Sequence, residues 1–139
     1  MAVDFSVEGT IELHPPVPLA QLWELIEGGR FQVAPHGMCE SELKAFVAQA
    51  KWALVPDADS GMDEQGRPNA INYLRVDDPE VYSFEISQRL ADLSAWMGAA
   101  HEFDGELQYQ DGDVGTTGVI EPFEDGQDPK WHETGGRLW

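Results

Sequence analysis

The chain has 139 residues, of which 26 are Asp or Glu and 8 are Lys or Arg, so its formal net charge is −18. This length predicts one domain with an ordinary hydrophobic core. The charge excludes proteins that bind nucleic acid or anionic membranes by general electrostatic attraction, because such binding needs Lys and Arg. Hydrophobic residues make up 42% of the chain and include five Trp, which argues against a disordered chain.

The single cysteine cannot form a disulfide within the chain. No apolar run is long enough to cross a bilayer. The first residues, Met1 to Asp4, show neither the basic start nor the apolar segment of a signal peptide. We therefore expect a cytoplasmic protein without membrane association.

The N-terminal third is predicted to contain a strand and a helix. Apolar and polar residues alternate from Asp4 to Leu13, which indicates a half-buried strand with a polar outer face. The prolines at positions 15, 16 and 18 are expected to end it, because proline cannot donate to a strand ladder. An apolar stripe (Leu19, Leu22, Trp23, Ile26) predicts a helix that stops at Gly28. Residues 30–39 are expected to form a loop.

The next segment is ambiguous between helix and strand. Residues 40–50 fit both periods, and we favour a strand that ends at Val55, with a helical turn before Lys51 as the alternative. Residues 56–69 are rich in turn-forming residues, and residues 70–76 are predicted to be the return strand of a long hairpin.

The second helix is expected to begin at Asp77-Asp78-Pro79-Glu80, which combines an Asp cap, an early Pro and an acidic first turn. Its apolar stripe is Tyr82, Ile86, Leu90, Leu93 and Met97. The alternative places a strand over residues 81–86. Residues 102–110 alternate as a further one-sided strand, and residues 114–123 are predicted to return as a weaker one.

This order, β-α-β-β-α-β-β, predicts an α+β domain over residues 1–124 with a C-terminal tail at 125–139. Each predicted strand has one apolar face, so a sheet with two helices on one face is the economical packing. That is the ferredoxin-like, or split βαβ, arrangement with an added strand, in which the first and fourth strands are neighbours. Carboxylates would then gather on the polar face of the sheet, namely Glu8, Glu12, Glu102, Asp104 and Glu106.

Asp57, Asp59, Asp63 and Glu64 resemble the start of a calcium-binding loop. An EF-hand loop needs Gly at its sixth position and Glu at its twelfth, where this chain has Met62 and Pro68. We therefore interpret the segment as a solvated hairpin tip whose carboxylates are candidate partner contacts.

No cofactor or metal site is predicted. His36 and Cys39 have metal-ligand spacing, but His101 and His132 are scattered, and a zinc site needs three or four ligands together. Residues 115–118 are rich in Gly and Thr but lack the Lys of a phosphate-binding loop.

The tryptophans divide into two groups. Trp23, Trp52 and Trp96 lie on predicted apolar stripes and are expected in the core. Trp131 and Trp139 lie in the polar tail, where they are candidate partner contacts or belong to a tail that folds back on the domain.

Short pieces of the sequence resemble a group of small proteins from actinobacteria and their phages. The pieces are GTIELHPPVP at residues 9–18, ALVP at 53–56 and HEFDGEL at 101–107. They cover about a quarter of the chain, and the 57–69 loop and the Trp-containing tail depart from the group's pattern. That group has no established activity, so the resemblance implies origin and fold and carries no catalytic residue across.

Taken together, these features predict a non-enzymatic interaction protein, a phage or actinobacterial accessory or inhibitor protein, whose acidic surface meets a basic surface on a protein partner. One alternative is a small-molecule-binding protein or enzyme with a cleft near residues 30–50, using His36, Cys39 or His101. Another is a structural subunit of a phage particle that docks through residues 131–139.

Overall fold

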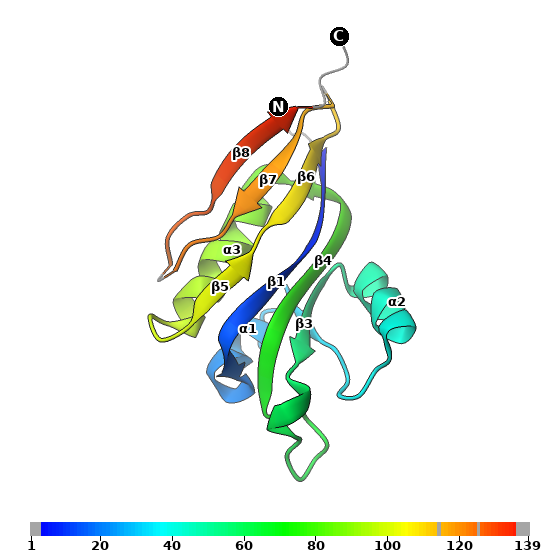
Figure 1. Cartoon of the computed structure of the whole chain (residues 1–139), viewed down its shortest axis with the longest axis vertical. Coiled ribbons are helices and arrows are strands. Elements are labelled where there is room, and N and C mark those ends of the chain that lie inside the picture. The colour runs from blue at the N-terminus through cyan, green and yellow to red at the C-terminus, as the bar shows by residue number, and fades with distance from the viewer. Residues whose placement is uncertain (1–3, 114, 125, 136–139) are drawn as a thin grey trace.

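The computed structural model describes residues 4–113, 115–124 and 126–135. It is a mixed α+β fold in which one eight-stranded sheet is accompanied by three α-helices (Figure 1). The strands are β1 (Asp4–Pro18), β2 (Gln32–Val33), β3 (Trp52–Pro56), β4 (Ala70–Tyr82), β5 (Glu102–Gly105), β6 (Leu107–Asp111), β7 (Thr117–Glu121) and β8 (Lys130–Gly135). The α-helices are α1 (Trp23–Glu27), α2 (Glu40–Ala50) and α3 (Ser83–Met97), and two short 3₁₀ helices are η1 (Leu19–Leu22) and η2 (Ala58–Ser60).

The sheet order is β2-β3-β4-β1-β6-β7-β8, and β5 also pairs with β1. The first predicted strand and the strand predicted over 102–110 are therefore neighbours, as expected. The sheet is larger than predicted because β2 extends one edge and β8 extends the other. All the paired neighbours are antiparallel except β2 and β3.

The prolines after Leu13 do not end β1, contrary to prediction. The pairing of β1 with β4 shifts register between Glu12 and Val17, and Pro15 and Pro16 lie within this irregularity. The backbone N–H groups in this irregular stretch are not needed for pairing with β4, so proline is tolerated there. Pairing resumes at Val17.

The same reasoning corrects the predicted start of the second helix. β4 continues through residues 77–80 to Tyr82, and α3 begins at Ser83. Pairing with β1 shifts register between Val7–Asp78 and Phe5–Val81, which places Pro79 in the irregularity rather than in a helix cap.

Residues 40–50 form a helix, so the favoured strand is wrong there and only residues 52–56 are strand. The backbone N–H of Cys39 donates to Oε1 of Glu42 at 3.2 Å, which helps to fix the first turn. Lys51 has φ 71°, and this left-handed residue reverses the chain into β3.

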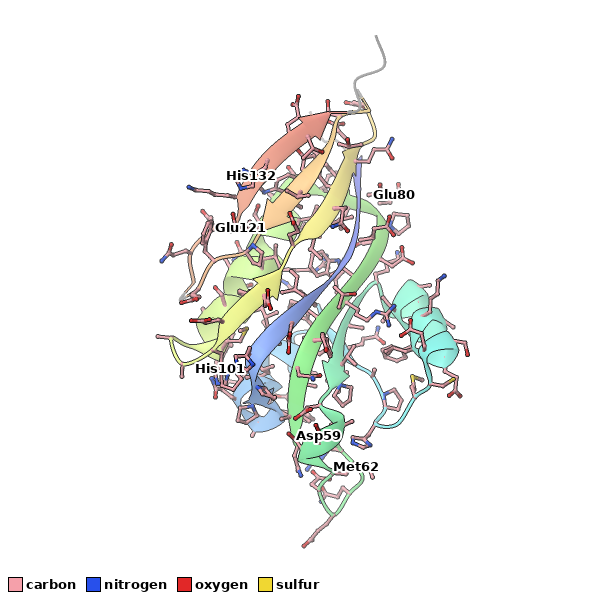
Figure 2. All side chains as sticks on the ribbon, viewed as in Figure 1. Asp59, Met62, Glu80, His101, Glu121 and His132 are labelled. Atoms are coloured by element: carbon pink, nitrogen blue, oxygen red, sulfur yellow. The ribbon has the colours of Figure 1, made fainter. Side chains whose placement is uncertain are left out.

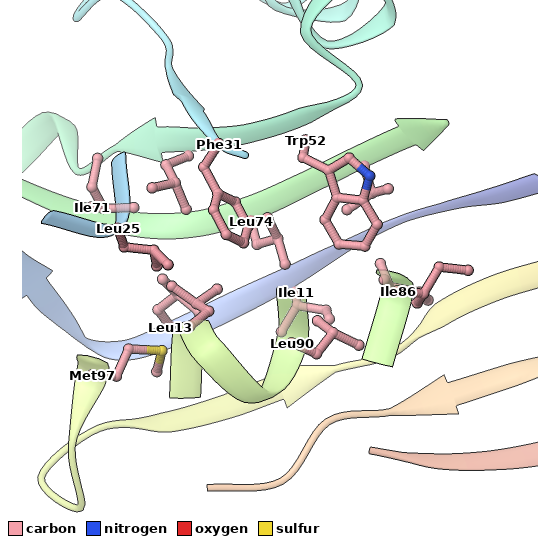
Figure 3. Packing of buried hydrophobic residues seen from close by; sticks show 14 of the residues in the cluster. Ile11, Leu13, Leu25, Phe31, Trp52, Ile71, Leu74, Ile86, Leu90 and Met97 are labelled. Atoms are coloured by element: carbon pink, nitrogen blue, oxygen red, sulfur yellow. The ribbon is translucent and has the colours of Figure 1, made fainter. Parts of the chain in front are cut away.

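The core lies between the sheet and the layer of α1 and α3 behind it (Figures 1 and 3). Its fully buried members include Ile11, Leu74 and Leu90 from β1, β4 and α3. Trp52 is 1% exposed, as expected of a core tryptophan. Trp23 and Trp96 are wrongly predicted as core, since they are 39% and 41% exposed.

The helix geometry explains why Trp23 and Tyr82 are exposed. The 3₁₀ turn at Leu19–Leu22 has fewer residues per turn than an α-helix, so Leu25 rather than Trp23 faces the core. In α3 the predicted stripe is buried from Ile86 to Met97, whereas Tyr82 precedes the helix and is 40% exposed.

Candidate functional site

The open face of the sheet, opposite α1 and α3, carries the predicted carboxylates, because residues 8 and 12 alternate with the buried residues of β1 and residue 104 lies opposite residue 12. We call Glu8, Glu12, Glu102, Asp104 and Glu106 the acidic face. Glu12 is half-buried and the other four are exposed. Glu102 and Asp104 lie on β5, and Glu106 lies between β5 and β6.

Strand register sets these carboxylates against one another. Glu12 lies directly opposite Asp104 across the β1–β5 pair. Glu8 lies opposite Asp77 of β4, a carboxylate that sequence reasoning missed because it assigned residue 77 to a helix cap. Directly opposed like charges on a sheet are unfavourable by about 0.2–1 kcal/mol per pair.

Basic side chains do not neutralise this arrangement. Within the described residues, no member of the acidic face forms an ion pair. Arg75 lies opposite Thr10 on the neighbouring strand, but its Nη1 is 3.1 Å from Oε1 of Glu40 on α2. The negative charge of the face is therefore left to solvent or to a partner.

The open face of the sheet is hollowed beside Glu8. A depression of about 440 Å³ crosses the strands between β4 and β7, and its lining includes Glu8, Asp77 and Gln108. A lysine or arginine side chain from another protein would fit such a depression with its charge beside two carboxylates.

The predicted contacts at the hairpin tip have structural roles. Asp57 accepts hydrogen bonds from the backbone N–H of Asp59 and from Oγ of Ser60. Asp63 accepts from the backbone N–H groups of Gln65 and Arg67 and from Nε of Arg67. The backbone hydrogen bond from Arg67 is the main reason that the pKa of Asp63 lies below its usual value.

Asp59 and Glu64 remain exposed at this tip. Figure 2 shows Asp59 and Met62 near one end of the long axis, away from Glu121 and His132. Asp57 and Asp59 line a further depression together with Thr10 of β1 and Arg75 of β4, so the hairpin tip adjoins the open face of the sheet.

Trp131 belongs to the sheet rather than to an exposed arm. It lies on β8, and its ring centroid is 5.5 Å from Phe5 and 4.8 Å from Tyr109. Its Nε1 donates to Oγ of Ser87 on α3 at 3.2 Å. Trp139 lies outside the described residues.

Of the side chains predicted for a small-molecule cleft, Cys39 lies at the start of α2 and His101 lies just before β5. Nδ1 of His101 donates to the carbonyl oxygen of Pro15 at 2.7 Å. Cys39 is exposed and lies 3.3 Å from Oγ of Ser41. Five surface pockets in the described part of the chain are lined by neither of these residues nor by His36.

A buried polar cluster lies at the end of β4, where the sequence suggested a helix cap. Asp78 is 4% exposed, and Nε1 of Trp52 donates to its Oδ2 at 2.9 Å. Arg89 of α3 lies 3.9 Å from the same oxygen and 5.1 Å from the Trp52 ring centroid. The predicted strand ends at Val76. Continuing the alternation of Leu74 and Val76 to the next residue on the same face would have placed Asp78 on the core side.

Two further observations bear on the class of protein. Among the described residues, no group of three or more His, Cys, Asp or Glu side chains is arranged to hold a metal ion. No helix in the described ranges has the length and apolarity needed to cross a membrane.

No family model matches the sequence, and neither the curated proteins nor the solved structures yield a match. The resemblance to actinobacterial and phage proteins therefore stays a prediction.

Proposed function

We propose that this chain is a non-enzymatic interaction module, a phage or actinobacterial accessory or inhibitor protein whose acidic face binds a basic surface on a protein partner. The observation that carries this proposal is the direct opposition of Glu12 and Asp104 without an ion pair among the described residues. Lys or Arg side chains of a partner would remove this repulsion and add attraction.

The energetics require several contacts at once. A solvent-exposed ion pair contributes about 0.2–1 kcal/mol, so one pair gives little affinity. The carboxylates recur at every second residue of β5, about 7 Å apart, and continue on the neighbouring strand β1. Such rows suit an extended basic surface, and they support the sharper proposal that the acidic face mimics the charge of a nucleic acid.

The architecture supports a finer proposal for the fold. We infer that β1, α1, β3, β4, α3 and the β5–β6 segment are a ferredoxin-like split βαβ core. Its support is the order β3-β4-β1-β6 with antiparallel neighbours, in which α1 and α3 are part of the connections between strands. In this proposal β2, α2, β7 and β8 are additions to the core.

Neutralising part of the acidic face tests the proposed function. The variant Glu102→Gln, Asp104→Asn, Glu106→Gln removes three negative charges. The control variant Glu24→Gln, Glu27→Gln, Asp128→Asn removes the same number from exposed carboxylates outside this face. Both should give the circular dichroism spectrum of the parent protein.

The readout is capture of basic proteins from the heparin-binding fraction of a bacterial lysate. We expect the acidic-face variant to lose about tenfold in capture, since three surface ion pairs at the values above amount to that order. The control should keep most of it, and added salt should weaken the parent protein's binding. Equal capture by both variants, or capture that salt does not change, would count against the proposal.

A further inference from the structure

A second site lies on the other side of the sheet, where α3 packs. A pocket of about 550 Å³ is formed by the end of β4, the outer stripe of α3 and Arg30 after α1. We call it the helix pocket; its lining includes Arg30, Tyr82, Phe84, Glu85, Arg89 and Asp92. Its volume is within the range of small-molecule sites, and such sites combine apolar walls with a few convergent polar groups.

One wall of the helix pocket is aromatic. The rings of Tyr82 and Phe84 are stacked, with centroids 5.7 Å apart and an angle of 13° between their planes. Tyr82 is 40% exposed and Phe84 is 70% exposed. An exposed pair of parallel rings offers a flat platform on which a further aromatic ring can stack.

Two of the polar side chains of the helix pocket are arginines that neighbouring side chains hold in place. Nη1 of Arg30 donates to Oδ2 of Asp92 at 2.9 Å, and Nε2 of Gln88 donates to the other oxygen, Oδ1, at 2.8 Å. Arg89 is fixed between the Trp52 ring and the buried carboxylate of Asp78. Such support keeps a guanidinium oriented before a ligand arrives.

The remaining hydrogen-bonding capacity favours an anion. Both oxygens of Asp92 are occupied by Arg30 and Gln88. Arg30 is half-exposed, and its guanidinium carries five N–H groups. Among the described residues, only its Nη1 atom has a hydrogen-bond partner. Arg30 is paired with Asp92 and Arg89 with Asp78, and Glu85 is the lining carboxylate without such a partner among the described residues, so selection of a ligand's acceptor oxygens depends on the free N–H groups of Arg30.

We propose that the helix pocket binds a small aromatic carboxylate, whose ring stacks on Phe84 and whose carboxylate accepts hydrogen bonds from Arg30. Arg89 lines the same pocket, and its charge is paired with Asp78. The negative charges of the distant acidic face oppose this binding weakly, because interactions between exposed charges are screened beyond about 8 Å at physiological salt.

The experiment compares two ligands with the same indole ring and opposite charges, indole-3-acetate and tryptamine. Each is titrated into the full chain and followed by backbone amide NMR shifts. For a ligand of this size we expect a Kd of about 1 mM or tighter for indole-3-acetate. Its largest shifts should fall on Arg30 and on residues 82–92, and tryptamine should bind at least about tenfold more weakly.

Variants then assign the binding to the helix pocket. Arg30→Gln and Phe84→Ala change exposed side chains, and each should weaken indole-3-acetate binding by about tenfold or more. Arg67→Gln is the matched control, because Arg67 also pairs with an aspartate, at 2.9 Å, and lies beside an exposed tryptophan, in a different pocket. It should bind as the parent protein does, as should the acidic-face variant, so this test is independent of the proposed function.

Several results would overturn the proposal. The first is the absence of saturable shifts up to about 10 mM indole-3-acetate, ten times the expected Kd. Tryptamine binding as tightly as indole-3-acetate would show that the pocket does not select an anion. Shifts located away from residues 82–92, or unchanged binding in Arg30→Gln, would place the ligand elsewhere.

Discussion

The two faces of β1 share one backbone and differ in every other respect. The face toward α3 presents Val7, Ile11 and Leu13, which are 2%, 0% and 0% exposed. The open face presents Glu8 and Thr10, both exposed, and carries the opposed pair of Glu12 and Asp104. Stability therefore comes from the buried face, while the open face is free to carry a charge pattern that the fold does not need.

The largest expected difference is between two adjacent residues of β1. Ile11→Ala leaves a cavity in the core and should lower the free energy of unfolding by about 3–4 kcal/mol. Thr10→Ala on the open face should change it by no more than about 0.5 kcal/mol. Urea denaturation followed by tryptophan fluorescence measures both. Similar losses of unfolding free energy in the two variants would contradict the claim that only the buried face of β1 stabilises the fold.

The next comparison is between two neighbouring aspartates, Asp77 and Asp78, on opposite faces of β4. Asp78→Asn removes the charge that Trp52 and Arg89 contact in the interior, and should cost about 2–3 kcal/mol of unfolding free energy. Asp77→Asn, on the open face opposite Glu8, should be neutral or slightly stabilising. The same denaturation experiment decides. An Asp77 variant that is the less stable of the two would contradict the assignment of faces.

The smallest expected effect is a gain. Glu12→Gln removes the repulsion from Asp104 and should raise the free energy of unfolding by about 0.2–0.5 kcal/mol at low salt. High salt should reduce this gain, because it screens exposed charges. Thermal unfolding at two salt concentrations, with Glu24→Gln on α1 as the control, measures it. A loss of stability in Glu12→Gln at low salt would show that Glu12 has a favourable contact.

The sequence allowed the two faces to be predicted because alternation is a local property. The residues of β1 and of 102–110 had the correct sides, and strand pairing brought them together at the expected neighbours. β5 and β6 keep a single register against β1, so the prediction of one strand over this stretch was close to the structure.

The predictions that are wrong concern residues whose structure depends on contacts with residues far along the chain. The sequence predicts that Pro15 ends a strand and that Pro79 lies in the first turn of a helix, yet each lies at a register irregularity that pairing with another strand creates. Residues 40–50 fit two periods, and packing on β3 and β4 decided for the helix. Asp78 resembled a cap until Trp52, 26 residues away, supplied its hydrogen bond. The helix pocket could not be predicted, because Arg30 and Asp92 meet only in the folded chain.

The most direct test of the central claim is to map where a cation binds. Backbone amide NMR spectra recorded with increasing decalysine peptide should show their largest shifts at Glu8, Glu12 and residues 102–106. In the acidic-face variant these shifts should need about ten times more peptide, and in the control variant they should persist. If the largest shifts fall on the hairpin tip at residues 57–64, or spread evenly over the helical side, the open face of the sheet is not the recognition surface.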